Sequence, residues 1–553
     1  MSGYQDWSLA GWQAHLRHLP AVADVRSFAA DLGEDTIPGL AAASASAVPG
    51  RVAVTVDGEP VTHAELDDGA ARVAGWLARR ITPGDRVLLA AAASVGFVRC
   101  YLGALRAGAV VVLANPGYTA AELGHLVADS GAVLAFADPG PARLLAALGP
   151  AVDPPETADV RMLPGDAGPG PGRAARPGDV ALLAYTSGTT GRPKGVPLTH
   201  RQLAVSIRSA MAAWGWSGDD VLAHALPVYH QHGLGGVHAA LIAGGTVHIR
   251  SRFSPANLAG TIRDTRASAL FAVPTIYQAL ADSKAVAPAD FAGLRLAVCG
   301  SAPLSPALAG RLTGLLGRLP LIRYGTTETG LNVSNPLDDP RGDTVGIPLP
   351  GVLARIVADP GPGSPVAEAA PGVAGGPGVA GGPGVAGGPG AAGGPGAEAA
   401  PGADGEIQLR GPQVFAGYWH DPVATQGAFT PDGWFRTGDI GAVDPVTGHL
   451  RIRGRTKEMI ITGGLNVYPR EVEIVLESHP SVAEAAVSGV PNERWGEQVT
   501  AWVVLRDGHR FDEADLIAHA RTRLAGYKCP KRVFQLAALP RNQLGKIVRA
   551  ALR

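Results

Sequence analysis

The chemically richest segment of this chain is a run of hydroxyl residues and glycines that ends in a lysine. Residues 180–184 are apolar and predict a short buried strand, and Tyr185-Thr186-Ser187-Gly188-Thr189-Thr190-Gly191-Arg192-Pro193-Lys194-Gly195 follows directly. Glycines let backbone N–H groups approach an anion, hydroxyls add donors, and lysine adds charge. The spacing does not fit the G-x-x-x-x-G-K-[ST] of a Walker loop. We therefore expect a phosphate-binding turn, called the phosphate turn below (residues 186–194), rather than an ordinary Gly/Ser/Thr turn.

Four further segments combine glycine with charged or hydroxyl residues. They are Tyr324-Gly325-Thr326-Thr327-Glu328, Arg436-Thr437-Gly438-Asp439, Gly454-Arg455-Thr456-Lys457 with the later Pro469-Arg470-Glu471-Val472-Glu473, and Pro540-Arg541-Asn542-Gln543-Leu544-Gly545-Lys546. Taken singly, an acidic residue beside glycine is usually a turn residue, and a lysine near a C-terminus is usually a solvated charge. In this order and spacing, the five segments resemble the adenylate-forming superfamily of acyl-CoA synthetases, luciferases and peptide-synthetase adenylation domains.

The resemblance implies an enzyme that activates a carboxylic acid with ATP. Attack of the carboxylate on the α-phosphate gives an acyl-adenylate and pyrophosphate, and a thiol then displaces AMP. The first step is catalysed mainly by positioning and by stabilising phosphoryl charge. We expect an AMP-forming acid–thiol ligase that uses ATP, Mg²⁺ and CoA. Whether the acceptor thiol is CoA or belongs to an acyl carrier protein stays open.

The resemblance also implies roles for individual residues. Lys546 is expected to bridge the substrate carboxylate and the α-phosphate, and Glu328 to ligate Mg²⁺; with His230 they form the expected catalytic set. Tyr324 is expected to stack on adenine and Asp439 to accept hydrogen bonds from the ribose. The full set of expected ATP-binding residues is Thr186, Ser187, Gly188, Thr189, Thr190, Gly191, Lys194, Gly300, Ser301, Ala302, Tyr324, Gly325, Thr326, Thr327, Asp439 and Arg455. CoA contacts are expected from Gly464, Lys528 and Lys531, and a hinge at Lys457.

Four histidines, His224, His230, His232 and His238, fall within fifteen positions. A metal site is one interpretation, but neither cysteine nor an ordered set of carboxylates accompanies them, and their spacing matches no standard zinc pattern. The segment instead resembles the acyl-pocket segment of malonyl-CoA synthetases.

A malonate-like acid carries a second carboxylate, which needs a charged partner when it is buried. Arg252 and Arg323 are the candidate cations, although both could form internal ion pairs instead. The expected acyl pocket consists of His230, Gln231, His232, Arg252, Arg323 and Thr326. Gln231 and Thr326 depart from the malonyl-CoA synthetase pattern, which leaves open a longer, branched or otherwise polar acid.

Bulk composition narrows the class of protein. The 553 residues exceed the usual size of a single core, so two or more domains are expected. A net charge of −1 without a basic block argues against nucleic acid as a partner. Three scattered cysteines argue against a disulfide framework. The first residues do not resemble a signal peptide, and the apolar runs are too short to span a membrane. We expect a cytoplasmic protein without a membrane span.

The order of elements predicts an α/β fold. Between residues 50 and 350, apolar runs such as 87–91, 109–113 and 294–298 alternate with helical stretches such as 94–107 and 274–281. Such alternation is typical of a mostly parallel sheet covered by helices. We expect a large N-terminal AMP-binding domain, residues 1–456, with layered, mostly parallel sheets, and a small mobile α/β domain, residues 457–553. Residues 1–43 carry no motif to which a role is assigned.

Residues 360–403 have low complexity. From 371 to 394 the unit P-G-V-A-G-G repeats, its fourth copy reading P-G-A-A-G-G, so glycine falls at every third position as in collagen. A triple helix would need three chains to meet between two strand-like segments, 353–357 and 406–410. A solvated loop that expands a hairpin connection fits better.

Two other functions compete with an acyl-CoA synthetase. Amino-acid adenylation domains usually hold the substrate amino group with an aspartate where Tyr229-His230 stand, and no aspartate occurs there. A catalytically silent nucleotide-binding homologue would be expected to have lost Lys546, Glu328 or the phosphate turn, and all three are present.

We predict that deletion of residues 372–396 changes turnover little. Long surface insertions add little loop-closure entropy, and this segment carries no group able to do chemistry. The measurement is kcat and KM of the deletion variant beside the full chain; a large loss of turnover in a folded variant would contradict the prediction.

Overall fold

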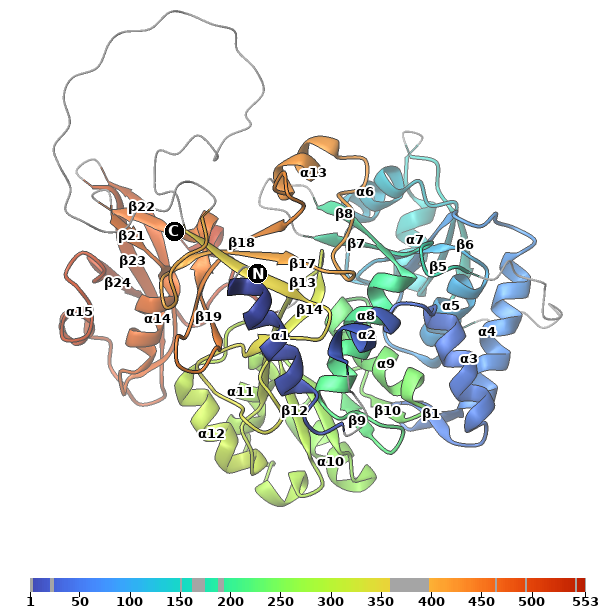
Figure 1. Ribbon diagram of the computed structural model, residues 1–553, viewed down its shortest axis with the longest axis horizontal. Helices are drawn as coiled ribbons and strands as arrows, with labels where there is room; N and C mark the ends of the chain where they lie inside the picture. Colours follow the sequence, from blue (N-terminus) through green and yellow to red (C-terminus); the bar gives the residue numbers. More distant parts are fainter. Residues whose placement is uncertain are drawn as a thin grey trace, which may run out of the picture.

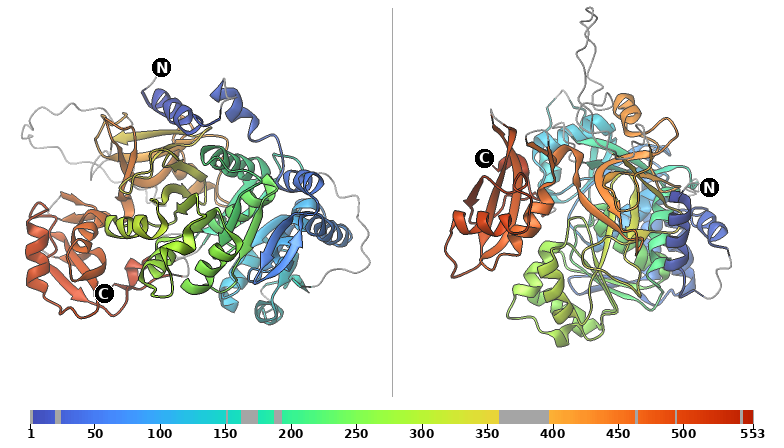
Figure 2. Two further views of the ribbon diagram at one scale, coloured as in Figure 1. Left: turned by 90° about the horizontal axis from the view of Figure 1, so that it is seen from below. Right: turned by 60° about the vertical axis from the view of Figure 1, so that its left-hand side comes forward.

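Two helix-covered, mostly parallel β-sheets make up most of the molecule, shown as a computed structural model in Figures 1 and 2. The structure describes residues 3–19, 24–149, 152–161, 175–186, 193–358, 397–462, 465–492, 495–542 and 545–552. The Gly-rich repeat and residues 187–192 therefore lie outside the described part. The prediction of a large α/β domain with a smaller C-terminal one is confirmed by the sheets described below.

The first sheet has six strands in the order β6-β5-β3-β4-β7-β8. All neighbours pair in parallel except β7 and β8, which form an antiparallel pair. The strands are β3 (Arg86–Ala90), β4 (Val110–Leu113), β5 (Leu134–Ala137), β6 (Glu156–Asp159), β7 (Val180–Thr186) and β8 (Lys194–Thr199).

The second sheet has nine strands in the order β15-β14-β13-β12-β11-β9-β10-β1-β2. Its centre is parallel, and antiparallel pairs occur only toward its two edges. The strands are β1 (Val52–Val56), β2 (Glu59–Thr62), β9 (Val221–His224), β10 (Thr246–Ile249), β11 (Ala269–Ala272), β12 (Leu296–Cys299), β13 (Leu321–Thr326), β14 (Gly330–Ser334) and β15 (Ile347–Pro348).

Helices cover both sheets, and several begin at side-chain caps that the sequence supplies. Thr62, Thr119 and Thr199 each accept a hydrogen bond from a backbone N–H in the first turn of the helix that follows. The helices of the large domain are α1 (Gly3–His15), α2 (Val25–Asp31), α3 (Ile37–Ala47), α4 (His63–Leu77), α5 (Val95–Arg106), α6 (Ala120–Ser130), α7 (Pro139–Ala146), α8 (His200–Ala213), α9 (Gln231–Ala243), α10 (Pro255–Thr265), α11 (Pro274–Asp282), α12 (Pro306–Leu316) and α13 (Pro422–Ala428). None of these helices, nor any other in the described residues, combines the length and apolar character needed to cross a bilayer.

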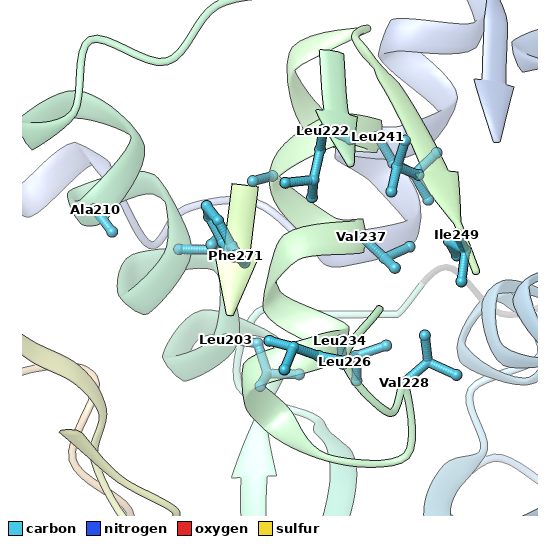
Figure 3. Close-up of a cluster of buried hydrophobic side chains, with 14 of the residues drawn as sticks. Leu203, Ala210, Leu222, Leu226, Val228, Leu234, Val237, Leu241, Ile249 and Phe271 are labelled. Carbon is cyan, nitrogen blue, oxygen red and sulfur yellow. The ribbon is translucent and has the colours of Figure 1, made fainter. Parts of the chain in front are cut away.

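The packing of α9 onto the nine-stranded sheet fixes the start of that helix. Leu234, Val237 and Leu241 are buried against side chains of β9, β10 and β11, as Figure 3 shows. The contact is close because Gly236 lacks a side chain: a Cβ there would lie 3.2 Å from both His224 Cε1 and Phe271 Cδ2. The first turn of α9, with its polar residues, is thereby held at the carboxyl end of the strands.

A third, antiparallel sheet has the order β16-β17-β18-β19, formed by β16 (Leu353–Ala358), β17 (Gly405–Arg410), β18 (Phe435–Val443) and β19 (Leu450–Arg455). The first two strands pair from Leu353 with Arg410 to Ala358 with Gly405. The prediction that a hairpin flanks the low-complexity segment is therefore confirmed on both sides.

The C-terminal part has its own sheet and its own core, and lies beside the large domain (red in Figure 1). Its strands are β20 (Ile460–Thr462), β21 (Leu465–Val467), β22 (Val482–Asn492), β23 (Gly496–Leu505) and β24 (Arg532–Gln535), and its helices are α14 (Pro469–Glu477) and α15 (Glu513–Arg521). The exact boundary at residue 456 stays a prediction.

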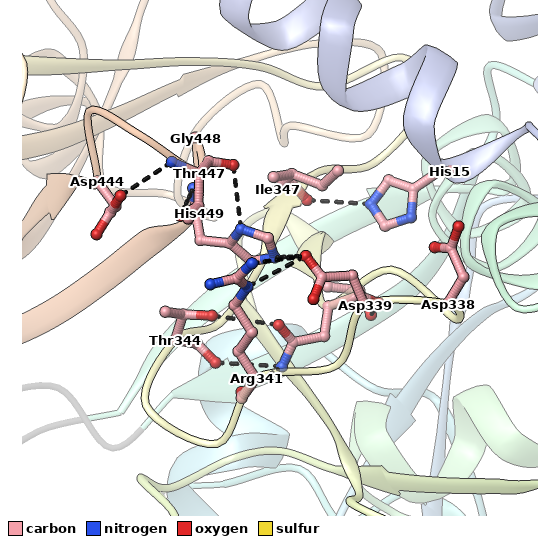
Figure 4. Close-up of polar contacts among 12 residues, drawn as sticks. His15, Asp338, Asp339, Arg341, Thr344, Ile347, Asp444, Thr447, Gly448 and His449 are labelled. Atoms are coloured by element: carbon pink, nitrogen blue, oxygen red, sulfur yellow. Dashed lines mark hydrogen bonds and ion pairs between the residues drawn. The ribbon is translucent and has the colours of Figure 1, made fainter.

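The N-terminal helix α1, for which no role is predicted from sequence, packs against the antiparallel sheet and supports it. Trp12 Nε1 donates to Val352 O at 2.9 Å, Trp7 Nε1 donates to Gly448 O at 2.7 Å, and Ala354 N donates to Ser8 Oγ at 3.2 Å. At its end, His15 Nε2 donates to Ile347 O at 3.2 Å, beside the loop that carries Asp338 and Asp339 (Figure 4). Because β16 is an edge strand, α1 covers backbone that would otherwise be exposed.

We predict that Trp12→Ala destabilises the protein by about 3 kcal/mol, because a buried indole and its hydrogen bond are lost together. Denaturant unfolding and hydrogen exchange of the β16 amides would measure the effect. Val446→Ala, at a 91 % exposed position, is the control. Equal unfolding midpoints for the two variants would contradict a bracing role for α1.

Candidate active site

A cavity of about 2150 Å³ lies where the two large sheets, the antiparallel sheet and the C-terminal domain meet. The segments that follow β9, β11, β12 and β13 all reach it, beginning respectively near His230, Val273, Ser301 and Thr326. Ligands of open α/β sheets bind at the carboxyl ends of parallel strands, where the loops leave the sheet. The cavity therefore has the position expected of a ligand site.

At one end of the cavity, the carboxylate of Asp439 contacts both Tyr324 and Arg455. Tyr324 OH donates to Asp439 Oδ2 at 2.6 Å, and Arg455 Nε lies 3.0 Å from Asp439 Oδ1. Burial, and then Asp439, raises the pKa of Tyr324 well above its ordinary value, so the phenol stays a donor. Asp439 raises the pKa of Arg455. These three side chains come from β13, β18 and β19, and the register of β18 with β19 places Asp439 opposite Arg455.

The ends of the phosphate turn are described, although its centre is not. Thr186 pairs with Lys194 across β7 and β8, and both line the cavity. Lys194 Nζ lies 3.6 Å from Asp421 Oδ2. The predicted ATP ligands Ser187, Gly188, Thr189, Thr190 and Gly191 lie outside the described residues.

Glu328 is the expected magnesium ligand. Its Oε1 accepts a hydrogen bond from Tyr418 OH at 3.0 Å, and the residue lines the cavity. Mg²⁺ usually binds one or two protein carboxylates together with substrate phosphates and water, so a single oriented carboxylate beside a phosphate turn fits this cation. Within the described residues no three His, Cys, Asp or Glu side chains converge into a metal cage, and this applies to the four histidines as well.

Lys546 reaches the cavity from the C-terminal domain. Its N–H donates to Asn542 Oδ1 at 3.0 Å, and Gly545, with φ +74°, has no side chain to collide with Thr275 at the start of α11. The side chain keeps access to solvent through the open cavity, yet the walls partly desolvate its ammonium and lower its pKa below the ordinary value of 10.5. Arg455 lowers this pKa further, and Asp439 opposes the shift.

A second cluster of polar groups lies at the first turn of α9. Gln231 Nε2 donates to Thr327 O at 3.0 Å, and His232 Nδ1 lies 3.1 Å from Ser301 Oγ. The Nε2 atoms of His230 and His232 are buried and have no hydrogen-bond partner in the described part of the chain. Burial lowers the pKa of His230 to about 4 and that of His232 well below its ordinary value, so both rings are neutral near pH 7. Thr326 Oγ1 bonds Thr329 Oγ1 at 2.9 Å.

Arg323 lines this part of the cavity, and no residue in the described part of the chain forms an ion pair with it. Its buried Nε has no hydrogen-bond partner among the described residues. Burial lowers the pKa of Arg323 to about 10, whereas a paired carboxylate would raise it. Gly300 makes room for the guanidinium, because a Cβ at residue 300 would lie 2.4 Å from Arg323 Nε. Ser301 follows with φ 71°, a strained conformation for a serine.

Some of the predicted site residues do not line the cavity, and for others the role remains a prediction. Arg252 is exposed and does not line the cavity, because it lies on the loop between β10 and α10, so the structure does not support it as a pocket cation. On the C-terminal domain, Lys528 pairs with Glu471 at 2.6 Å and Lys531 donates to Gly526 O, and neither lysine lines the cavity. Gly464 lies outside the described residues. Ala302, Gly325 and Lys457 line the cavity.

Sequence reasoning missed two residues beside the phosphate turn, Tyr418 and Asp421. Both belong to the segment after β17, where an aromatic residue in a loop is usually a packing residue. Only the contacts with Glu328 and Lys194 distinguish them.

Comparisons with known proteins place this site in a family. Residues 41–388 match the AMP-binding enzyme family, and residues 471–546 match the AMP-binding enzyme C-terminal domain. The chain belongs to the AMP-binding enzyme family. The prediction of an AMP-forming acid–thiol ligase that uses ATP, Mg²⁺ and CoA is confirmed at the level of this family and its relatives.

Among its relatives, a feruloyl-CoA synthase of Amycolatopsis sp is 37 % identical over 517 residues, which are 91 % of this chain and 96 % of the relative. A mitochondrial malonate–CoA ligase of Homo sapiens is 38 % identical over 392 residues, 67 % of this chain and 65 % of the relative. The crystal structure of ATP-bound MatB from Rhodopseudomonas palustris is 34 % identical, with a TM-score of 0.82, and covers 94 % of this chain and 98 % of MatB. The apo structure of the same protein gives a TM-score of 0.72.

We predict that Lys546→Ala reduces ATP–pyrophosphate exchange by about 10²–10³, since a positioned cation that stabilises developing charge is lost. Thiolysis of a supplied acyl-adenylate by CoA should remain. In the unmutated enzyme the exchange rate should fall on the alkaline side at a pH below 10.5, because the lowered pKa of Lys546 means that its ammonium is lost at lower pH than in an ordinary lysine. Near-normal exchange by Lys546→Ala would contradict this role.

Proposed function

We propose that this enzyme activates a small dicarboxylic acid of the malonate type and transfers its acyl group to CoA. One carboxylate is converted to the acyl-adenylate, and the second stays ionised in the pocket at the start of α9. The observation that carries the proposal is the uncompensated guanidinium of Arg323 in the wall of the cavity.

The charge of Arg323 argues for an anionic partner supplied by the substrate. Removing a cation from water without a counter-ion is costly, and the titratable groups that interact with Arg323, namely Cys299, His232 and Lys546, carry no negative charge. Burial raises the pKa of Cys299 to about 12, which keeps its thiol neutral. A carboxylate bound here would restore the charge balance. An alkyl chain would leave the cation uncompensated.

The neutral histidines support the same substrate class. His230 and His232 have unpartnered Nε2 atoms, and a neutral imidazole can donate a hydrogen bond from that nitrogen to a carboxylate. The first turn of a helix also presents free backbone N–H groups, and His230 forms no side-chain cap for α9.

In the first half-reaction, the remaining residues would hold ATP. Tyr324 would stack on adenine, Asp439 and Arg455 would hold the ribose, and Lys194 with the phosphate turn would hold the β- and γ-phosphates. Lys546 would stabilise the negative charge as the substrate carboxylate approaches the α-phosphate. Mg²⁺, when bound at Glu328, would neutralise phosphate charge.

The second half-reaction involves the C-terminal domain. We propose the boundary between residues 456 and 457, since Lys457 lies in a short 3₁₀ turn, Thr456–Glu458, between β19 and β20. Gly464, Lys528 and Lys531 remain the proposed CoA contacts, and an acyl carrier protein is the alternative acceptor. A cytoplasmic location is proposed because the three cysteines, all described and all buried, are free thiols.

A larger substituted acid is the second candidate. The feruloyl-CoA synthases match more of this chain than the malonate–CoA ligases do, and the cavity wall includes the apolar side chains of Leu234, Phe271 and Leu331. An aromatic acid could occupy that wall.

We predict that Arg323→Leu raises the KM for malonate by about 100-fold, because removing one partner of a buried ion pair costs several kcal/mol. The KM for a short monocarboxylate should change far less. Arg252→Leu is the matched control, since this arginine is exposed and lies outside the cavity.

The measurement is pyrophosphate release with malonate, methylmalonate, ferulate and decanoate, with and without CoA. A preference of the unmutated enzyme for decanoate would contradict the proposal. A preference for ferulate would favour the second candidate.

A further inference from the structure

The segment from Phe415 to Asp421, called the bracket segment below, connects the phosphate turn to Glu328. Its Trp419 N–H donates to Gly195 O at 2.8 Å, directly after Lys194 on β8. Its Phe415 N–H donates to Glu328 O, also at 2.8 Å. The backbone of the bracket segment is therefore hydrogen-bonded both to β8, next to Lys194, and to Glu328, the residue expected to hold magnesium.

Within the bracket segment, Tyr418 touches both functional side chains. Its hydroxyl donates to Glu328 Oε1 at 3.0 Å, and Lys194 Nζ lies 5.2 Å from the centroid of its ring. The first contact orients a carboxylate, and the second is a cation–π contact. Tyr418 thus contacts the side chains of both Glu328 and Lys194.

Two further contacts fix the tyrosine itself. Its backbone N–H donates to Thr425 Oγ1 at 2.9 Å, and the ring of the fully buried Phe415 meets it edge-on at 4.9 Å. Burial, with Glu328 as the next cause, raises the pKa of Tyr418 above its ordinary value, so the phenol donates throughout the neutral range. A donor that is rigid and always protonated can hold one carboxylate oxygen in place.

We propose that Tyr418 is a positioning residue that sets the orientation of Glu328 toward Mg²⁺ and its distance from Lys194. The proposal rests on the proposed nucleotide site but not on the identity of the acid. Tyr418 holds Oε1 of Glu328, which would leave the other carboxylate oxygen available to Mg²⁺ when the cation is bound. The Tyr418 ring and Asp421 hold the Lys194 ammonium, which would bind the phosphates of ATP. Partners that orient a metal ligand usually change metal affinity by 10–100-fold when they are removed.

The two functions of the bracket segment can be separated by substitution. Tyr418→Phe removes the hydroxyl and keeps the ring, so it should affect metal binding alone. Asp421→Asn removes the ion pair with Lys194 and keeps the Glu328 contact, so it should affect nucleotide binding alone. Tyr277→Phe is the matched control, because it removes another buried tyrosine hydroxyl, whose hydrogen bond goes to Val298 O.

The test measures binding of Mn²⁺, as a spectroscopic probe for Mg²⁺, to the full chain in the presence of a non-hydrolysable ATP analogue, by electron paramagnetic resonance. Calorimetry measures binding of the analogue without metal. Tyr418→Phe should weaken Mn²⁺ binding about tenfold while metal-free binding of the analogue is unchanged. Asp421→Asn should weaken binding of the analogue, and at analogue concentrations that saturate the variant it should leave Mn²⁺ binding unchanged.

Thermal melts of each variant check folding. Mn²⁺ affinity of Tyr418→Phe within twofold of the unmutated chain would overturn the proposal, as would an equal loss in Tyr277→Phe. No acid is present in these measurements, so a failed malonate assay leaves their outcome unaffected. Failure of the analogue to bind the unmutated chain would overturn the proposed nucleotide site and this inference together.

Discussion

Several positively charged side chains lie close together in one cavity, and the surrounding structure must hold them there. Lys546 lies within electrostatic range of Arg455 and Arg323, and both lower its pKa, whereas Asp439 and Glu328 act in the opposite direction. Groups of like charge remain together only when the fold holds them there, and here each is supported by a different element. Arg323 lies on β13 beside Gly300, Arg455 on β19, and Lys546 on a turn that contacts α11. Bound anions reduce the repulsion among these cations. A site with this charge therefore suits ATP and an ionised carboxylic acid, which are both anionic.

The domain arrangement makes this charge distribution dependent on conformation. Lys546 belongs to the C-terminal domain, so any rotation about the turn at Lys457 would remove one cation from the cavity. Similarity to the ATP-bound MatB structure is greater than to its apo structure, with TM-scores of 0.82 and 0.72. In the described arrangement Lys546 lines the cavity, as the role proposed for it in the first half-reaction would require.

The two halves of the site differ in how they are supported. The ribose end depends on strand register, since β18 and β19 place Asp439 opposite Arg455. The phosphate end depends on a loop, because the bracket segment joins β8 to Glu328 through Tyr418 and Trp419. Strand register is set by a ladder of backbone hydrogen bonds. The loop has fewer backbone hydrogen bonds than a pair of strands. Its side-chain contacts therefore matter more for the positions of Glu328 and Lys194.

The sequence by itself determined the family and the reaction class, and many of the site residues that it predicts line the cavity. Short segments such as Tyr324 to Glu328 and Asn542 to Lys546 place their functional groups through local backbone geometry, and local geometry can be read from adjacent residues. The alternation of strands and helices likewise determined the fold class, since the period of a buried strand differs from that of an amphipathic helix.

Only the tertiary structure distinguished the two candidate arginines. Arg252 and Arg323 are hard to tell apart in sequence, because each comes shortly after a strand-like run and neither has an acidic residue next to it. Their difference comes from the order of strands: Arg323 lies on β13 against Gly300 after β12, whereas Arg252 leaves β10 on an exposed loop. The contacts of Tyr418 with Glu328 and of Trp12 with Val352 join residues 90 and 340 positions apart. Such contacts arise only when the sheets assemble, so no local pattern in the chain specifies them.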